Sequence, residues 1–176
     1  MQFVCAIDAD PAELFISEWP AVNPATESNG TIFEGSYEMK ASPDRIWEFI
    51  VDPTKIGRCL PDLKSLEIEG EDKFVAVTRV GVGPIRTDFK FRMEITRKEP
   101  PSRVELRADG YGSGSRVNLD IGIEIRQVAG GSLLVYRSEV KVGGMMAGLG
   151  QRVITDTAGK TVTSIFDCVK KQMEKT

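Results

Sequence analysis

The chain has 176 residues, of which 41% are hydrophobic, and its formal net charge is −3 at pH 7. These values suit one domain with a buried core, and they give no sign of a nucleic-acid-binding surface. The sequence contains no histidine, which excludes Ser-His and Cys-His nucleophiles, histidine-bearing zinc sites and a histidine general base.

Residues 1–29 are set apart from the rest of the chain by Pro11, Pro20 and Pro24. We expect a flexible N-terminal extension with one short helix that starts at Pro11, after the capping residue Asp10. Three interpretations of this extension are open: a peptide that docks on a partner, a flap packed on its own domain, or a disordered tail. Residues 30–176 are expected to form a single domain.

The regular pattern starts with residues 31–40, which alternate apolar and polar side chains. This alternation predicts a strand that is buried on one face. Ser42 then caps a short helix that has Pro43 at its first position. Asp52 and Pro53 end this helix, and a second short helix is predicted around residues 53–57.

Six further strands are predicted from alternation of apolar and polar residues, with turns rich in glycine and proline between them. They cover residues 64–70, 73–80, 85–98, 103–109, 116–126 and 132–142. Such alternation is typical of an antiparallel sheet with one solvated face and one buried face. The sequence therefore predicts one curved sheet of about seven strands, whose buried face needs a cover.

The predicted cover is a long C-terminal helix over residues 146–174. Hydrophobic residues recur at helical spacing along it, from Met146 to Met173. Lys170, Lys171 and Lys175 lie at its end, where cations suit the helix dipole. The alternative for these lysines is a basic patch that contacts a membrane.

Residues 142–154 read VGGMMAGLGQRVI and place four glycines at the predicted start of this helix. A glycine inside a helix costs about 1 kcal/mol relative to alanine. We therefore expect a ligand or a neighbouring backbone to pass close to this stretch. Our hypothesis is that it forms one wall, or the lip, of an apolar cavity between helix and sheet. The alternative is a tight strand-to-helix turn packed against Trp47, with no cavity.

The buried face of the sheet and the helix supply the candidate ligand-binding residues. These are Phe74, Thr78, Phe89, Phe91, Met93, Leu106, Leu119, Ile121, Gly144, Met145, Met146, Gly148, Leu149 and Val153. Few polar groups are predicted on the same face, namely Thr78, Thr87, Ser138 and Tyr37. Because the Asp and Glu residues fall mostly on the solvated face, we expect no catalytic residues and no metal ligands.

Five motifs occur in an order that resembles the family of the carbon monoxide dehydrogenase G subunit. They are FEGSYEMKASPDRIWEFIVDP, RCLPD, VGVGPI, GYGSGS and VGGMMAGLGQRVI, and the resemblance covers residues 33–170. It implies the START-like (SRPBCC) helix-grip fold, an α+β architecture in which a curved antiparallel sheet wraps a long C-terminal helix and two short helices follow the first strand. The chain departs from the family at Pro61-Asp62, where Pro-Gly is usual.

The resemblance also implies a function. It suggests a non-catalytic accessory protein of a molybdenum hydroxylase such as aerobic carbon monoxide dehydrogenase, which aids membrane recruitment or electron hand-over to quinone. The implied partners are the hydroxylase subunits, a hydrophobic small molecule and a peripheral membrane contact, with no nucleic acid. No cofactor is implied in this chain apart from a bound quinone or lipid.

Two other functions are compatible with the sequence. A cavity enzyme of the cyclase or hydrolase type would need buried carboxylates, or a tyrosine such as Tyr37 or Tyr111, inside the cavity. A pure protein-docking accessory would bind its partner through residues 1–29.

The cysteines and the absence of targeting signals suggest the compartment. Cys5, Cys59 and Cys168 are odd in number and far apart, so we expect neither a disulfide framework nor a metal site. The N-terminus lacks the basic region of a secretory signal, and no apolar run approaches the ~20 residues that span a bilayer. We therefore expect a cytoplasmic protein that is peripheral at the inner face of the membrane.

Overall fold

The structure is a computed structural model that describes residues 30–175. The extension and short helix predicted within residues 1–29 lie outside the described residues. In chain order the elements are β1 (Thr31–Met39), α2 (Pro43–Ile50), α3 (Pro53–Gly57), β2 (Leu63–Ile68), β3 (Lys73–Val82), β4 (Ile85–Glu99), β5 (Arg103–Gly112), β6 (Ser115–Val128), β7 (Gly131–Gly144), η1 (Met145–Leu149) and α4 (Gln151–Glu174).

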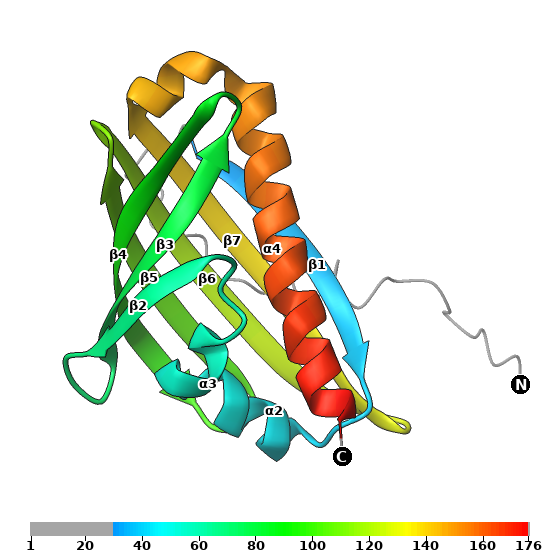
Figure 1. Ribbon diagram of the computed structural model, residues 1–176. Coiled ribbons are helices and arrows are strands. Elements are labelled where there is room, and N and C mark those ends of the chain that lie inside the picture. Colours follow the sequence, from blue (N-terminus) through cyan, green and yellow to red (C-terminus); the bar gives the residue numbers. More distant parts are fainter. Residues whose placement is uncertain (1–29, 176) are drawn as a thin grey trace, which may run out of the picture.

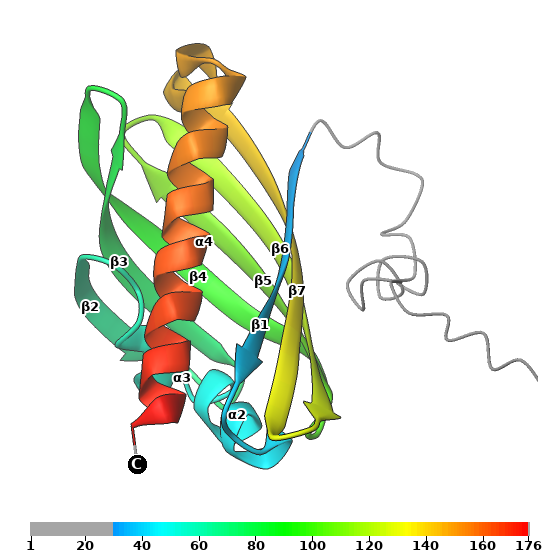
Figure 2. The same cartoon turned by 90° about the vertical axis from the view of Figure 1, so that its right-hand side faces the viewer.

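The seven strands form one antiparallel sheet in the order β1-β7-β6-β5-β4-β3-β2 (Figure 1). The sheet curves around α4, which crosses its concave side, while α2 and α3 lie at one end (Figure 2). This confirms the predicted helix-grip fold, with two short helices after the first strand and a long helix at the C-terminal end. No helix between residues 30 and 175 combines the length and the hydropathy needed to traverse a bilayer.

Local signals read from the sequence explain both short helices. The Ser42 side chain accepts a hydrogen bond from the Arg45 amide at 3.4 Å, and Pro43 starts α2. The Asp52 carboxylate accepts from the Thr54 amide at 2.9 Å and from the Lys55 amide at 3.3 Å at the start of α3. These side chains satisfy amides that have no partner within the helix.

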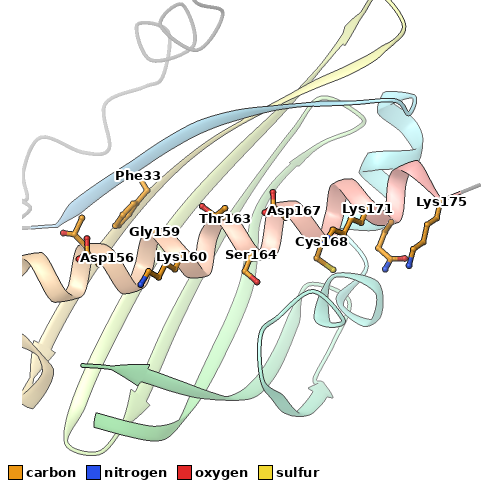
Figure 3. Close-up of a pocket in the computed structure, with 12 residues that line it drawn as sticks. Phe33, Asp156, Gly159, Lys160, Thr163, Ser164, Asp167, Cys168, Lys171 and Lys175 are labelled. Atoms are coloured by element: carbon orange, nitrogen blue, oxygen red, sulfur yellow. The ribbon is translucent and has the colours of Figure 1, made fainter. Parts of the chain in front are cut away.

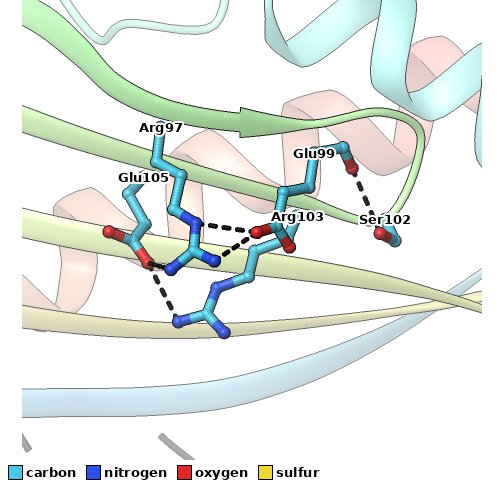
Figure 4. Close-up of polar contacts among 5 residues, drawn as sticks. All are labelled: Arg97, Glu99, Ser102, Arg103 and Glu105. Atoms are coloured by element: carbon cyan, nitrogen blue, oxygen red, sulfur yellow. Dashed lines mark hydrogen bonds and ion pairs between the residues drawn. The ribbon is translucent and has the colours of Figure 1, made fainter. Parts of the chain in front are cut away.

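The convex face of the sheet carries charged side chains of both signs, as predicted for a solvated face. At the β4–β5 turn, Arg103 donates to Glu105 at 2.9 Å, and Arg97 contacts both Glu99 and Glu105. The Ser102 hydroxyl donates to the Glu99 carbonyl at 3.1 Å (Figure 4). Exposed ion pairs of this kind contribute about 0–1 kcal/mol each, so they keep this face soluble more than they stabilise the fold.

The largest hydrophobic cluster lies at the base of the molecule, the end that carries α2 and α3. Phe166 of α4 stacks on Tyr136 of β7 and on Tyr37 of β1, with ring centroids 4.4 and 5.3 Å away. Trp47 belongs to the same cluster. Gly35 leaves space for the Tyr136 ring of this cluster, because a Cβ at position 35 would lie 2.7 Å from that ring.

A disulfide connects the base to the long helix. Cys59, in the segment after α3, is bonded to Cys168 of α4, and their Cα atoms are 5.4 Å apart, within the usual range for such bonds. The prediction that the cysteines form no disulfide is therefore wrong. Sequence spacing could not reveal the pair, because the fold brings together two residues that are 109 positions apart.

The glycine-rich stretch is not the start of the long helix. Residues Met145–Leu149 form the short 3-10 helix η1, and α4 begins only at Gln151. Gly144 and Gly150 flank η1 with φ values of 78° and 91°, in the left-handed region that favours glycine. None of the four glycines of this stretch lies inside α4, so the predicted loss of helix stability does not arise.

Candidate functional site

The candidate site is the middle of the concave face, beneath α4. There the central strands point apolar side chains toward the helix, with Leu106 opposite Ile121 and Phe91 opposite Gly110. Leu119 and Ile123 continue this row on β6. All of these side chains are half-buried, although they belong to interior strands and lie on the covered face. The middle of the face is therefore only partly covered.

The packing around this middle explains why it stays accessible. α4 makes its main strand contacts with β1 and β3, near the two edges of the sheet. Three packed clusters surround the middle: the base cluster around Phe166, a cluster on the β3 side around Phe74, and a cluster at the opposite end around Phe89. α4 rests near the margins of the curved sheet, and Leu106, Leu119 and Ile123 pack at the borders of these clusters while they stay partly accessible.

The structure divides the predicted ligand-binding residues into three groups. Five are buried in packed surroundings: Phe74, Thr78, Phe89, Met93 and Met146. Six are half-buried: Phe91, Leu106, Leu119, Ile121, Leu149 and Val153. Three are exposed or nearly so at the glycine-rich stretch: Gly144, Met145 and Gly148. Phe91, Leu106, Leu119 and Ile121 line the candidate site together with Ile123, whereas Leu149 and Val153 pack on the cluster around Phe89.

The two adjacent methionines have opposite environments. Met146 is 2% exposed and packs with Val82 and Phe89, whereas Met145 is 67% exposed. Nothing lies within 4 Å of the position that a Cβ would take at Gly148, so no close approach explains that glycine. The alternative turn packed against Trp47 is also wrong, because Trp47 lies in the base cluster at the other end of the sheet.

The concave face offers hydroxyl groups as its polar partners. Burial, followed by the proximity of Tyr37, raises the pKa of Tyr136. Burial, followed by the charge of Asp167, raises the pKa of Tyr37. Both phenols therefore remain neutral at physiological pH and can donate a hydrogen bond. Tyr111, the other predicted cavity tyrosine, instead lies on the convex side and is 52% exposed.

The side chains that face the concave middle are apolar. The strand residues that point to the concave middle include no carboxylate. Within residues 30–175, no three Cys, Asp or Glu residues are grouped so that they could hold a metal ion. The arrangement can bind an apolar molecule and donate hydrogen bonds to its oxygen atoms.

Two open hollows lie outside this site. The larger, of about 910 Å³, follows α4 and is lined by Phe33 and by polar or charged helix residues such as Lys160, Asp167 and Lys171 (Figure 3). The second, of about 560 Å³, lies beside the β5–β6 turn. Gly144 lines the second hollow and is the one predicted ligand-binding residue that lines either of them. Both hollows are open to solvent, and charged side chains border the larger one, so neither encloses an apolar ligand.

A comparison with known protein families identifies the family of this chain. A family model for CoxG, the G subunit of carbon monoxide dehydrogenase, matches residues 35–174. The chain belongs to this family. The match confirms the resemblance drawn from the five sequence motifs. No curated protein matches the chain significantly.

Solved structures agree with this assignment. The chain is similar to a conserved protein from Geobacillus kaustophilus, with 28% identity and a TM-score of 0.77 over 82% of this chain and 96% of that one. It is also similar to a START superfamily protein from Mycobacterium smegmatis (13% identity, TM-score 0.65, 81% and 97% covered). The Zhui aromatase/cyclase from Streptomyces sp. R1128 shares the fold as well (14%, 0.64, 82% and 94%). The fold is therefore START-like.

Three of the five CoxG motifs meet at one end of the sheet. VGVGPI forms the β3–β4 turn, GYGSGS forms the β5–β6 turn, and VGGMMAGLGQRVI runs from β7 through η1 into α4. The Met145 amide donates to the Gly114 carbonyl at 3.2 Å, and the Met146 amide donates to the Ser115 hydroxyl at 3.0 Å. Gly144 is required here, because a Cβ would collide with the Gly114 carbonyl oxygen.

Sequence reasoning missed part of the site. Ile123 and Tyr136 face the concave side but were not among the predicted ligand-binding residues. Their alternation with the charged residues Glu124 and Arg137 gives the correct face, and it would have included them. What alternation could not show is which concave residues stay accessible, because that depends on where α4 rests.

Proposed function

We propose that this CoxG-family protein is a non-catalytic binding protein for a hydrophobic molecule, a quinone or a lipid-like chain, held in the concave middle. The observation that carries the proposal is the row of half-buried apolar side chains on β5 and β6, including Leu106, Leu119 and Ile121. The neutral phenols of Tyr37 and Tyr136 lie toward the base end of the same face. They are suited to a carbonyl or hydroxyl group at one end of such a ligand.

Energetics favour a long apolar ligand over a small polar metabolite. Each buried CH₂ group contributes about 0.8 kcal/mol. Ten to fifteen carbons therefore supply roughly the 8 kcal/mol of a micromolar complex, before the cost of ordering the ligand. A small polar molecule would lose its hydration and find only a few hydroxyl partners.

Membership of this family suggests which enzyme uses the bound molecule. We propose that the protein is an accessory of a molybdenum hydroxylase such as aerobic carbon monoxide dehydrogenase, which it aids in membrane recruitment or in electron hand-over to quinone. A carrier for a hydrophobic redox molecule needs an apolar, unreactive interior. A chain without histidine, and without a strand carboxylate in the concave middle, agrees with that requirement.

A substitution that fills the concave middle tests the proposal. Ile121→Trp adds a large ring at the concave middle, whereas Val128→Trp adds the same ring at an exposed position of the same strand, β6. We expect Ile121→Trp to weaken binding of a decyl-substituted benzoquinone at least tenfold, and Val128→Trp to leave it unchanged. Equal binding by parent and Ile121→Trp, with both folded by circular dichroism, would show that the ligand does not occupy this place.

The natural ligand can be sought directly. We expect native mass spectrometry of protein purified gently from its source to show a mass above that of the bare chain. Solvent extraction should then recover a quinone or a lipid. A bare mass, together with no binding of the benzoquinone by the parent protein, would contradict the proposed function.

A further inference from the structure

The tip of the molecule has a composition unlike the rest of its surface. We define the tip as residues 80–87, 110–118 and 142–155, which meet at the end of the sheet opposite α2 and α3 (Figure 1). These segments contain three arginines, Arg86, Arg116 and Arg152, and no Asp or Glu. The tip thus carries a charge of +3 within a chain whose net charge is −3.

Apolar groups project from the same tip. Met145 is 67% exposed and Tyr111 is 52% exposed, which makes them two of the most exposed large apolar side chains among the described residues. The neighbouring residues Ala147 and Gly148 are exposed and uncharged. The guanidinium of Arg116 lies 5.3 Å from the centre of the Tyr111 ring. An exposed methionine surrounded by small residues, tyrosine and arginine is the pattern of a surface that enters the boundary between lipid headgroups and acyl chains.

Two of the three arginines have no ion-pair partner among residues 30–175, namely Arg86 and Arg152. Arg116 forms an ion pair with the Asp109 carboxylate at 3.8 Å, and it is exposed. Asp88, the nearest acid on β4, is held by Lys64 at 2.8 Å and by Arg79 at 3.4 Å. Basic groups next to an anionic bilayer gain about 1 kcal/mol each, which is about a fivefold gain in affinity.

We propose that the tip docks on a membrane containing anionic lipids, with Met145 inserted and the three arginines contacting headgroups. A bilayer suits the tip, because an anionic surface attracts its three arginines and the headgroup boundary accepts the exposed Met145 side chain. This proposal depends on the proposed function, because docking at a membrane would serve to load the hydrophobic ligand. The Met146, Val82 and Phe89 cluster lies directly behind Met145, so a docked tip places the interior apolar face next to the lipid that supplies the ligand.

This surface differs from the basic patch considered at the end of α4. Lys160, Lys171 and Lys175 line the groove along α4 and are exposed, with Lys171 and Lys175 at the base end (Figure 3). They provide a matched control, since changing three lysines to glutamine alters the net charge of the protein as much as changing the three tip arginines.

The test is co-sedimentation of the full chain with phosphatidylcholine vesicles, with and without one-third phosphatidylglycerol. We expect binding to the anionic vesicles that falls at high salt. R86Q/R116Q/R152Q should reduce it by roughly a hundredfold, at about fivefold per arginine, and M145E by at least tenfold. The matched variant K160Q/K171Q/K175Q should bind much more tightly than the arginine variant. I68E changes a residue that is 53% exposed at the opposite end of the sheet and should bind like the parent.

The outcomes separate this proposal from the proposed function. If the parent binds the benzoquinone but neither type of vesicle, the tip does not dock on membranes. A protein partner would then be the explanation for the exposed groups of the tip. If the lysine and arginine variants lose equal affinity, general charge explains the binding and the proposal is wrong. If the parent binds vesicles through Met145 and the arginines but never takes up the benzoquinone, the tip proposal stands and the proposed function fails. R86Q/R116Q/R152Q should keep its affinity for the benzoquinone in solution.

Discussion

The disulfide between Cys59 and Cys168 should control a large part of the stability of this protein. The bond closes a loop between residues that are 109 positions apart. Closing a loop of that length in the unfolded chain removes conformational entropy worth about 5 kcal/mol at 25 °C. A typical domain has a free energy of unfolding of only about 5–15 kcal/mol. Reduction should therefore remove between a third and all of the stability of the folded state.

Urea denaturation measures this effect. With a slope of about 2 kcal/mol per molar urea, a loss of about 5 kcal/mol lowers the midpoint by roughly 2.5 M. We expect that shift when the parent protein is treated with a dithiol reductant. Each disulfide then exchanges with the dithiol to give two cysteine thiols and an oxidised, cyclic reductant. The double variant C59A/C168A should unfold near the reduced parent, whether or not reductant is present.

A matched control isolates this bond from the third cysteine. Cys5 lies outside the described residues, and C5S removes it without touching the pair. We expect C5S to keep the full response to reductant. If oxidised C5S and C59A/C168A unfold at the same urea concentration, the bond does not form or does not constrain the chain, and the reasoning fails.

Three further predictions test the packing around the site. Gly159→Ala should raise the free energy of unfolding by up to about 1 kcal/mol, because a Cβ there would lie 3.8 Å from the Phe33 ring, an ordinary contact; a loss measured by urea denaturation would contradict this packing. Gly35→Ala should lower the free energy of unfolding by about 1–3 kcal/mol, because the added Cβ would press on the Tyr136 ring. An unchanged midpoint of urea denaturation would show that the ring lies elsewhere. Burial raises the pKa of the Tyr136 phenol in the folded protein above its ordinary value of 10.0. The contribution of the neutral phenol to the stability of the folded state should therefore be complete below pH 10 and should be lost as the pH rises through the folded-state pKa. Ultraviolet titration of the folded parent and of Tyr136→Phe would detect this, and an unshifted phenol would count against a buried ring.

Much of the fold could be predicted because each strand obeys local rules. Alternation along residues 85–98 correctly placed Phe89 and Phe91 on one face and the charged residues on the other. Side-chain caps at Ser42 and Asp52 marked both short helices. The predicted GYGSGS turn was too long, because both strands extend into it and only Ser113 and Gly114 remain as the turn. Glycine suggested a turn, but pairing of Gly112 with Ser115 across the hairpin continued the ladder.

The candidate site was predicted less completely, because it depends on distances between elements. The stretch around Met145 and Met146 was predicted to line a cavity as one unit. The structure separates them, since Met146 packs inward while Met145 projects into solvent. Neither residue has a sequence signal that distinguishes it from the other.

Local patterns along the chain specify which side chains share a face, where the short helices begin and which chemistry is excluded. Those properties follow from periods of two and 3.6 residues and from residue type, which are local. Three other features follow only from the folded arrangement: α4 rests near the edges of the sheet, Cys59 meets Cys168, and Arg86, Arg116 and Arg152 gather at one tip. Each of these joins residues distant in the chain, and their meeting depends on the curvature of the whole sheet.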